Sequence, residues 1–212
     1  MKPLICIGGG GHARVLIDAV KHSHGQILGV VDCQKEIQGS QIFGVPVIGD
    51  DDCLARYLPG EVELINGIGS VGNPSRRKEI YLRLKKYGYT FASVMHPNTV
   101  IATDVKIDEG AQVMAGAILQ PNVVVGCNVI LNTRSSIDHD CIIHDHAHVA
   151  PGVILSGGVV IGEGVHLGVG AVVAQNITIG KDATIGAGAV VLKDVPECSV
   201  AWGVPAEVRK YQ

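Results

Sequence analysis

The stretch IATDVKIDEGAQVMAGAILQPNVVVG, residues 101–126, places a large aliphatic side chain at every sixth position, beginning with Ile101 and Ile107. The spacing continues without an insertion to Val191, and all sixteen positions are Ile, Leu or Val. Four residues after each of them stands a small or β-branched side chain. An amphipathic helix repeats its apolar residues at three and four, and a simple strand repeats them at two. A period of six therefore predicts a parallel β-helix, in which each hexad supplies one short strand and one turn.

Three hexads are expected to close one triangular coil, so sixteen hexads make about five coils. At the usual strand spacing of roughly 4.8 Å, these coils stack into a prism about 25 Å long. Positions eighteen residues apart then lie one above another. By this rule His139 shares a column with Gly157, and His148 shares a column with His166.

The composition fits such a core and narrows the classes of partner. Hydrophobic residues make up 47% of the chain, aromatic residues only 4%, and there are 28 glycines, which indicates an aliphatic core on a turn-rich backbone. The net charge of −3 offers no basic surface for nucleic acid or anionic lipid, so a small-molecule partner is expected.

Two further features of the sequence bear on the cellular compartment of the protein. The six cysteines contain no C-x-x-C pair, which favours reduced packing residues over a zinc ribbon or a redox motif. The first apolar run, residues 4–7, is too short for a signal sequence or a membrane span. We expect a cytoplasmic protein without a membrane span.

Residues 1–95 follow another pattern, that of a Rossmann-like nucleotide-binding domain. LICIGGGGHARVLIDAV, residues 4–20, predicts a buried strand, a glycine turn and an amphipathic helix, and a second strand over residues 26–32 ends in Asp32. The full dinucleotide fingerprint is incomplete, because Ala13 stands where the last glycine belongs, but half a Rossmann fold is enough for one nucleotide. The expected ligands are the amides of Gly10, Gly11 and His12 for a diphosphate, and Asp32 for the base or ribose.

A third strand is predicted over residues 62–68 and ends at Gly69, which is expected to contribute to the same sugar-nucleotide site. A charged helix is predicted to follow over residues 73–88. Arg76 and Arg77 of this helix either contact phosphate or are ordinary solvated residues. A fourth short strand, within residues 90–97, is expected to lead into the coils.

The segment SSIDHDCIIHDHAHVAPG, residues 135–152, holds four of the nine histidines, which raises the possibility of a metal site. A catalytic zinc needs three converging protein ligands. His148 and His166 could supply two, but Ile130 and Thr184 occupy the neighbouring places in their column. We therefore expect no metal site, and we expect His144 and His146 to decorate solvated turns.

His139 stands between Asp138 and Asp140 in this segment. A carboxylate that binds one imidazole nitrogen fixes the tautomer and raises the basicity of the other nitrogen, which predicts a general base. One coil on, Gly157 has no side chain to block the column, so its backbone N–H could stabilise a developing oxyanion.

The motif resembles that of the sialic acid O-acetyltransferase family, hexapeptide-repeat acyltransferases that include the N-acetyltransferases of nucleotide-linked 4-amino sugars. The matching parts are Asn132-Thr133, Asp138-His139-Asp140 and His148-Val149-Ala150-Pro151-Gly152. AWGVPAEVRK, residues 201–210, resembles the segment beside the adenine end of coenzyme A in these enzymes.

This resemblance implies a left-handed β-helix over residues 96–212, with His139 as the base and Asp140 as its support. It also implies coenzyme contacts at His148, Val169 and Ala187, a sugar-nucleotide site that includes Asn132, and a homotrimer. Apolar residues at outward positions, namely Met114, Ile118 and Ile130, fit a face buried between subunits. Some members of the family carry a second acid where Cys33 follows Asp32 here, which leaves the nucleobase open.

The resulting hypothesis is acetyl-CoA-dependent N-acetylation of a 4-amino sugar carried on a nucleoside diphosphate, UDP in the first instance, in the synthesis of bacterial surface glycans or glycoproteins. The same base could O-acetylate sialic acid or a related sugar hydroxyl. A scaffold or binding module without enzymatic activity is the third alternative.

Overall fold

The computed structural model describes residues 2–23, 25–70 and 74–209. The chain divides into two compact units, residues 1–97 and 98–212. Among the described residues, no helix is both long and apolar enough to cross a membrane.

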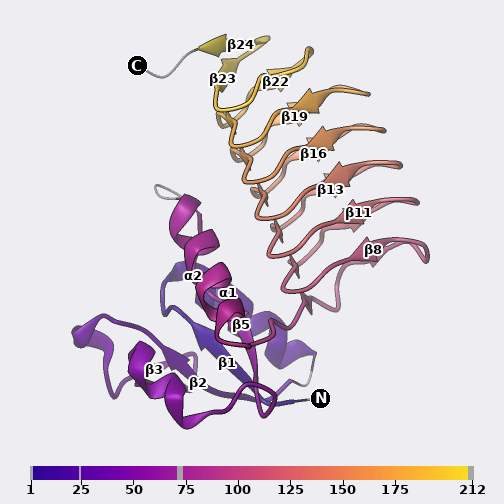
Figure 1. The fold of residues 1–212 in the computed structure, drawn as a ribbon. Coiled ribbons are helices and arrows are strands. Elements are labelled where there is room, and N and C mark those ends of the chain that lie inside the picture. The colour runs from indigo at the N-terminus through magenta and orange to yellow at the C-terminus, as the bar shows by residue number, and fades with distance from the viewer. Residues whose placement is uncertain (1, 24, 71–73, 210–212) are drawn as a thin grey trace. The chain divides into compact units, whose positions relative to one another are not determined.

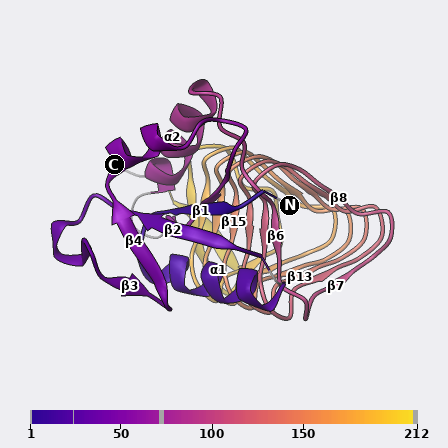
Figure 2. The ribbon, with the colours of Figure 1, turned by 90° about the horizontal axis from the view of Figure 1, so that it is seen from below.

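The first unit is a five-stranded sheet with one helix on each face (Figure 2). Its strand order is β3-β4-β2-β1-β5, and only the pairing of β3 with β4 is antiparallel. The strands are β1 (Leu4–Ile7), β2 (Ile27–Val31), β3 (Gln41–Ile42), β4 (Val45–Gly49) and β5 (Glu63–Asn66), and the helices are α1 (Gly11–His22) and α2 (Pro74–Lys86). Two 3₁₀ helices, η1 (Lys35–Ile37) and η2 (Asp51–Arg56), follow β2 and β4. Every residue of β1 is buried, as expected for a strand that has a partner on each side in an α/β sheet.

The sequence did not indicate the β3–β4 hairpin. The apolar run of β4 is interrupted by Pro46, which argues against a strand that lies inside a sheet, yet β4 pairs in parallel with β2. Pro46 is tolerated because the pairing of β4 with β2 begins only at Val47, and Pro46 itself stands opposite Gln41 of the short edge strand β3. The strand expected within residues 90–97 is reduced to β6 (Val94–Met95) and an isolated bridge between Phe91 and Leu64.

The second unit is a stack of coils, drawn in rose to gold in Figure 1. Its strands are two residues long and recur every six residues. They are β7 (Val100–Ile101), β8 (Lys106–Ile107), β9 (Gln112–Val113), β10 (Ile118–Leu119), β11 (Val124–Val125), β12 (Ile130–Leu131), β13 (Ser136–Ile137), β14 (Ile142–Ile143), β15 (His148–Val149), β16 (Ile154–Leu155), β17 (Val160–Ile161), β18 (His166–Leu167), β19 (Val172–Val173), β20 (Thr178–Ile179), β21 (Thr184–Ile185) and β22 (Val190–Val191). An antiparallel hairpin of β23 (Val200–Gly203) and β24 (Ala206–Arg209) ends the stack.

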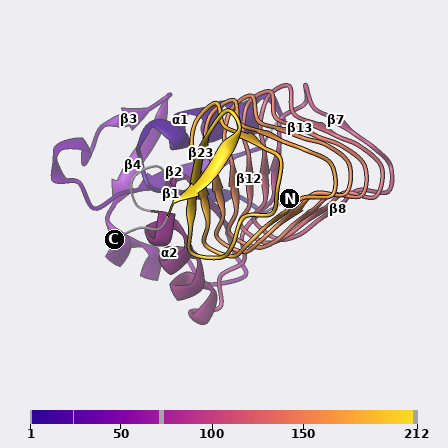
Figure 3. The same ribbon diagram turned by 90° about the horizontal axis from the view of Figure 1, so that it is seen from above.

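The pairing register confirms the eighteen-residue coil. Ile118 pairs with Ser136, and Ser136 pairs in turn with Ile154, always in parallel. Within this unit every third strand joins the same sheet: β22-β19-β16-β13-β10-β7, β20-β17-β14-β11-β8, and β21-β18-β15-β12-β9. Seen along the stack, the coils overlie one another (Figure 3). The predicted fold, a Rossmann-like domain followed by a left-handed parallel β-helix, is confirmed.

The aliphatic residue that ends each strand points into the core, and from Val113 to Val191 these positions are buried. Two of the three residues that we expected to be exposed for contact with another subunit are also buried. Met114 and Ile130 are fully inaccessible within the single chain, so that part of the prediction is wrong, whereas Ile118 is partly exposed. Among the described residues of this unit, the large aliphatic side chains that do face solvent are Val100, Ile142, Ile154, Val169, Leu192, Val204 and Val208.

Candidate active site

His139 and Asp140 form a hydrogen-bonded pair on the turn between β13 and β14. His139 Nδ1 lies 2.7 Å from Asp140 Oδ2, and both side chains are about half exposed. The hydrogen bond raises the pKa of His139 above its ordinary value and lowers that of Asp140. Asp138 has a different contact, since its Oδ1 accepts the backbone N–H of His139 at 2.8 Å. With the Nδ1 proton donated to Asp140, the lone pair of the imidazole is on Nε2, the atom that can accept a proton from a substrate.

The turn is shaped by left-handed residues that stack from coil to coil. Asp140 has φ 60°, and Asn122, one coil earlier in the same column, has φ 62°. Asn122 Nδ2 donates to Asp140 Oδ1 at 3.0 Å, so each carboxylate oxygen of Asp140 has a separate partner. We had not predicted a role for Asn122, although its position eighteen residues before Asp140 was a usable signal.

Gly157 lies directly beside the imidazole. A Cβ added to Gly157 would be 2.6 Å from both Cε1 and Nε2 of His139, closer than real side chains approach. The backbone of Gly158 adds a contact, because its N–H donates to the His139 carbonyl at 2.9 Å. The expected stacking of His139 and Gly157 is therefore present, and the ring occupies space that any other residue at 157 would fill.

His148 and Asn132 are brought together, but away from solvent. His148 is only 5% exposed, its Nε2 lies 3.2 Å from Asn132 Nδ2, and its ring packs edge-on against His166 at 4.9 Å between centroids. Burial lowers the pKa of His166. Of the two histidines assigned to solvated turns, His144 is exposed, and His146 Nδ1 lies 3.0 Å from Asn128 Nδ2.

Val169 and Ala187 stack on a different turn from His139. Both are exposed, and the N–H of Gly188 donates to the Val169 carbonyl at 2.8 Å. Val169 precedes β19, whereas His139 follows β13, and these two strands belong to one sheet. The two turns therefore border the same face of the coil at opposite ends of its strands, and a single coil does not bring them together.

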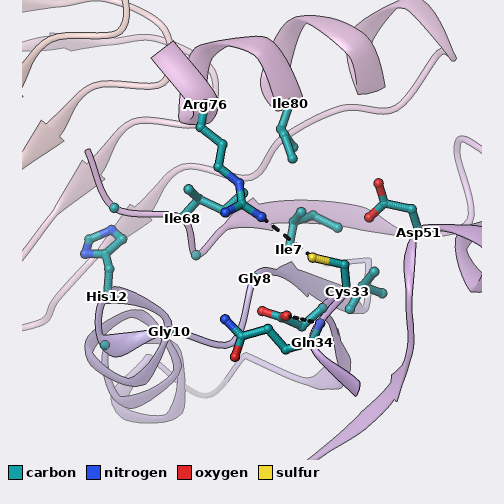
Figure 4. A pocket seen from close by; sticks show the side chains of 15 residues that line it. Ile7, Gly8, Gly10, His12, Cys33, Gln34, Asp51, Ile68, Arg76 and Ile80 are labelled. Carbon is teal, nitrogen blue, oxygen red and sulfur yellow. Dashed lines mark hydrogen bonds between the residues drawn. The ribbon is translucent and has the colours of Figure 1, made fainter. Parts of the chain in front are cut away.

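In the first unit, a pocket of about 390 Å³ opens where β1, β2 and β5 end (Figure 4). It is lined by Ile7, Gly8, Gly10, Gly11, His12, Val31, Asp32, Cys33, Gln34, Asp51, Gly67, Ile68, Gly69, Arg76 and Ile80, which include the five predicted nucleotide ligands of this domain. The carboxyl ends of parallel strands are the usual place for ligands in open α/β sheets.

The glycine loop presents backbone amides to this pocket. Gly10 is the N-cap of α1, and a Cβ added to Gly10 or Gly11 would meet no atom within 4 Å, so both face open space. Among the described residues, no side chain caps this helix end and no acidic residue stands in its first turn. Such an end attracts a phosphate through its unpaired N–H groups and the helix dipole.

The carboxylate of Asp32 accepts two backbone hydrogen bonds, one of them from the glycine loop. Its Oδ2 accepts the N–H of Gly9 at 2.6 Å, and its Oδ1 accepts the N–H of Gln34 at 2.8 Å. Part of its hydrogen-bonding capacity is therefore used inside the protein, where it fixes the loop that lines the pocket.

The two arginines of α2 have different environments. Arg76 lines the pocket and reaches toward Cys33, with Nη2 at 3.7 Å from the sulfur (Figure 4). Arg77 is buried, so it is neither a solvated residue nor a phosphate ligand. Its Nη1 donates to the carbonyls of Asn66 and Ile68 at 2.6 and 2.7 Å, and burial lowers its pKa to about 9. Arg77 thus clamps the pocket wall after β5, a role that no local sequence pattern indicated.

Two protein-family models match separate parts of the chain. Residues 3–84 match the PglD N-terminal domain, and residues 158–193 match the bacterial transferase hexapeptide family of six repeats.

Several solved structures resemble this chain over nearly its full length, and two of them illustrate the likeness. One is a perosamine N-acetyltransferase variant from Caulobacter crescentus in complex with CoA and GDP-perosamine, at 34% identity and a TM-score of 0.91, with 100% of this chain and 98% of that chain covered. The other is the acetyltransferase domain of PglB from Neisseria gonorrhoeae with acetyl coenzyme A, at 32% identity and a TM-score of 0.90, covering 98% and 99%. A UDP-N-acetylbacillosamine N-acetyltransferase of Bacillus subtilis is 34% identical over 119 residues, which are 54% of this chain and 52% of that protein.

Proposed function

The chain belongs to the hexapeptide-repeat N-acetyltransferases of nucleotide-linked 4-amino sugars, and on this premise we propose that it acetylates the 4-amino group of such a sugar with His139 as the general base. It is an acetyl-CoA-dependent sugar N-acetyltransferase. The observation that carries the mechanism is the 2.7 Å contact between His139 Nδ1 and Asp140 Oδ2, which leaves Nε2 available as a base.

The chemistry needs a neutral amine. The amine nitrogen attacks the thioester carbon of acetyl-CoA, the C–S bond breaks, and an amide and a free thiol are formed. His139 Nε2 takes the proton that the amine loses, directly or through a water, and returns it to the departing thiolate. The backbone N–H of Gly157 is the proposed donor to the oxyanion of the tetrahedral intermediate. Asp140 supports the imidazolium that forms during the reaction.

We propose that the diphosphate of the sugar nucleotide binds the amides of Gly10, Gly11 and His12, with Asp32 and Gly69 beside the nucleoside. One similar structure holds a GDP-sugar and one similar enzyme is named for a UDP-sugar, so the carrier is the open part of the proposal. UDP stays our first prediction. Asn132 beside His148 is the proposed contact to the sugar, and Val169 and Ala187 are the proposed contacts to coenzyme A.

A homotrimer is the proposed working unit. The His139 and Val169 turns lie at opposite ends of one face, so a neighbouring coil packed on that face would bring the base of one subunit toward the coenzyme turn of another. Exposed Ile154, on β16 of the same sheet, gives this face an apolar character that fits such packing. Light scattering should give about three times the 22.2 kDa of the chain. A fully active monomer would contradict the shared site.

We further propose that the protein acts in the cytoplasm, in the synthesis of bacterial surface glycans or glycoproteins.

A direct test combines binding and transfer. Thermal shift with UDP-, GDP-, dTDP- and CMP-sugars identifies the carrier, because a ligand that binds only the folded state raises the unfolding temperature. The identified carrier, bearing a 4-amino sugar, is then offered with acetyl-CoA, and release of the free thiol is measured. The matching 4-hydroxy sugar and sialic acid are the controls. Faster acetylation of a hydroxyl than of the amine would favour the O-acetyltransferase alternative.

A further inference from the structure

A cluster of metal-ligating side chains lies in the first unit, away from the nucleotide pocket. Among the described residues, Asp18, His22 and His96 are the group of three whose ligand atoms all lie within 4.8 Å of one another. Asp18 and His22 are four residues apart on α1 and therefore share one face of the helix. His96 comes from another element, directly after β6, which packs against α1.

The geometry is close to that of a bound divalent ion. In a tetrahedral zinc site with ligands at about 2.0–2.2 Å, neighbouring ligand atoms are about 3.3 Å apart. One ligand atom of each of the three residues lies within 4.8 Å of those of the other two, and the rings of His22 and His96 are 5.4 Å apart between centroids. Side-chain rotations alone can close the remaining gap, because Asp18 and His22 are exposed on a helix surface.

The surroundings of the cluster also suit a metal. His22 Nδ1 lies 2.9 Å from the carbonyl oxygen of Asp18. When Nδ1–H donates to that carbonyl, Nε2 keeps its lone pair, and metal-binding histidines commonly use their second nitrogen in this way. His96 is 8% exposed, whereas the other two side chains are about half exposed. One ligand is therefore fixed in the protein, and the outer side is open for an ion to enter and for water to complete its coordination.

An ordinary surface pair explains only part of this arrangement. His22 stands in the last turn of α1, where a positive charge is favourable, and Asp18 is a natural partner for it. That explanation does not involve His96, which is buried and belongs to a separate segment of the chain. Two imidazoles and one carboxylate from two elements form a ligand set typical of Zn²⁺.

We propose that Asp18, His22 and His96 bind one Zn²⁺ or a similar divalent transition-metal ion, which links the C-terminal end of α1 to the segment after β6. The proposed site uses these three of the described residues and is independent of the acetyl-transfer proposal. Because an ion held by both elements binds the folded unit and not the unfolded chain, it stabilises the fold.

The experiment uses the full chain without a polyhistidine tag, stripped with a chelator and dialysed. Titration with ZnCl₂ by calorimetry should give one ion per chain, and Co²⁺ should give the visible absorption of a nitrogen-ligated site. His22→Ala and His96→Ala should each weaken binding at least about tenfold. They should also abolish the rise in unfolding temperature that Zn²⁺ causes. His144→Ala removes an exposed histidine of the coil and should bind like the wild type.

Two results would overturn the proposal. One is the lack of a bound Zn²⁺ in the wild type. The other is unchanged affinity in His22→Ala, which would place the ion elsewhere, for example at the His148–His166 pair. His22 is exposed, so its replacement keeps the test valid even if His96→Ala folds poorly, which circular dichroism will show.

Discussion

The turn that carries His139 and the pocket beside Gly10 are held together by different kinds of contact. The partners of Asp140 stand one and eighteen residues away in the chain, so they follow from the repeat itself. The pocket depends on irregular separations, since Asp32 holds an amide 23 residues away and Arg77 holds a carbonyl eleven residues away. A stacked turn can therefore change its side chains without disturbing the core, whereas part of the pocket wall, namely Ile7, Val31 and Gly67, is also buried core. We expect the first site to separate turnover from stability and the buried part of the second to couple them.

The largest effect on turnover is expected for the proposed general base, His139, where turnover and stability should change independently. His139→Ala should lower turnover by at least about two orders of magnitude, because general base catalysis contributes on the order of 10²–10⁴. The side chain is about half exposed, so the unfolding temperature should hardly change. Steady-state kinetics measure the turnover, and a thermal melt measures the unfolding temperature. Turnover within tenfold of the wild type would rule out His139 as the base.

Gly157→Ala tests the position of the His139 ring by adding a single methyl group beside it. The new Cβ would occupy the place of the imidazole, so His139 must move, and a displacement of about 1 Å can cost up to roughly 10²-fold in rate. We expect turnover to fall about thirtyfold. In the His139→Ala background the same change should cost nothing further, because no ring is left to displace. Equal losses in both backgrounds would show that the methyl acts on something other than His139.

Asp140→Ala should reduce turnover about tenfold, since it removes the orientation of the ring and not the base itself. Asp140 raises the pKa of His139, and a base is active when deprotonated, so its rate rises as the pH passes that pKa. Loss of Asp140 lowers the pKa and should move the acidic limb of the kcat/KM profile to lower pH. Asp138→Ala, which removes a backbone partner, is the matched control and should shift the limb less. An equal kinetic loss in the control would mean that the wrong acid has been assigned.

The smallest effect is expected in the pocket. Gly10→Val adds a side chain that points into open space, so it should raise KM for the sugar nucleotide about fivefold, which corresponds to about 1 kcal/mol of lost hydrogen bonding. KM for acetyl-CoA and the unfolding temperature should stay nearly unchanged.

Gly67→Ala is the contrasting variant in the same wall. Its Cβ would be 2.8 Å from the Gly8 carbonyl oxygen and 2.9 Å from the Ala13 Cβ, atoms that cannot easily move. Overpacking of this kind typically costs about 1–3 kcal/mol, so the free energy of unfolding should fall. If Gly10→Val destabilises the fold as much as Gly67→Ala, the open face of the glycine loop has been misidentified.

The repeat explains why the coils could be predicted in detail. One period fixes the strand, the inward residue and the column, and this is enough to place His139 over Gly157 from the sequence. The contact of Asn122 with Asp140 could have been predicted by the same rule. The burial of Met114 and Ile130 could not, because the six-residue period defines which side chains point outward from a coil but not which of them are covered.

The first unit shows the opposite case. The glycine loop and its strands follow from local patterns, and the residues predicted to bind the nucleotide line one pocket. The β3–β4 hairpin was missed because its pairing overrides the local signal of Pro46. The burial of Arg77 was missed because a helix rich in charged residues gives no sign of which one turns inward. Tertiary contacts decide both features, and a single sequence does not encode them in any local pattern.

The uninterrupted repeat limits how many residues this domain can lose or gain. Deletion of one residue within a coil would shift the later repeats by one position, so that the aliphatic residues would no longer stand at the inward positions of their hexads. Deletion of six residues would restore the aliphatic core but rotate all later turns by one corner, which would carry Gly157 away from His139 if the cut fell between them. Only a loss or gain of eighteen residues preserves both the core and the columns, and it leaves the pair intact when it falls beyond Gly158. The tolerated steps in the length of this domain are therefore whole coils.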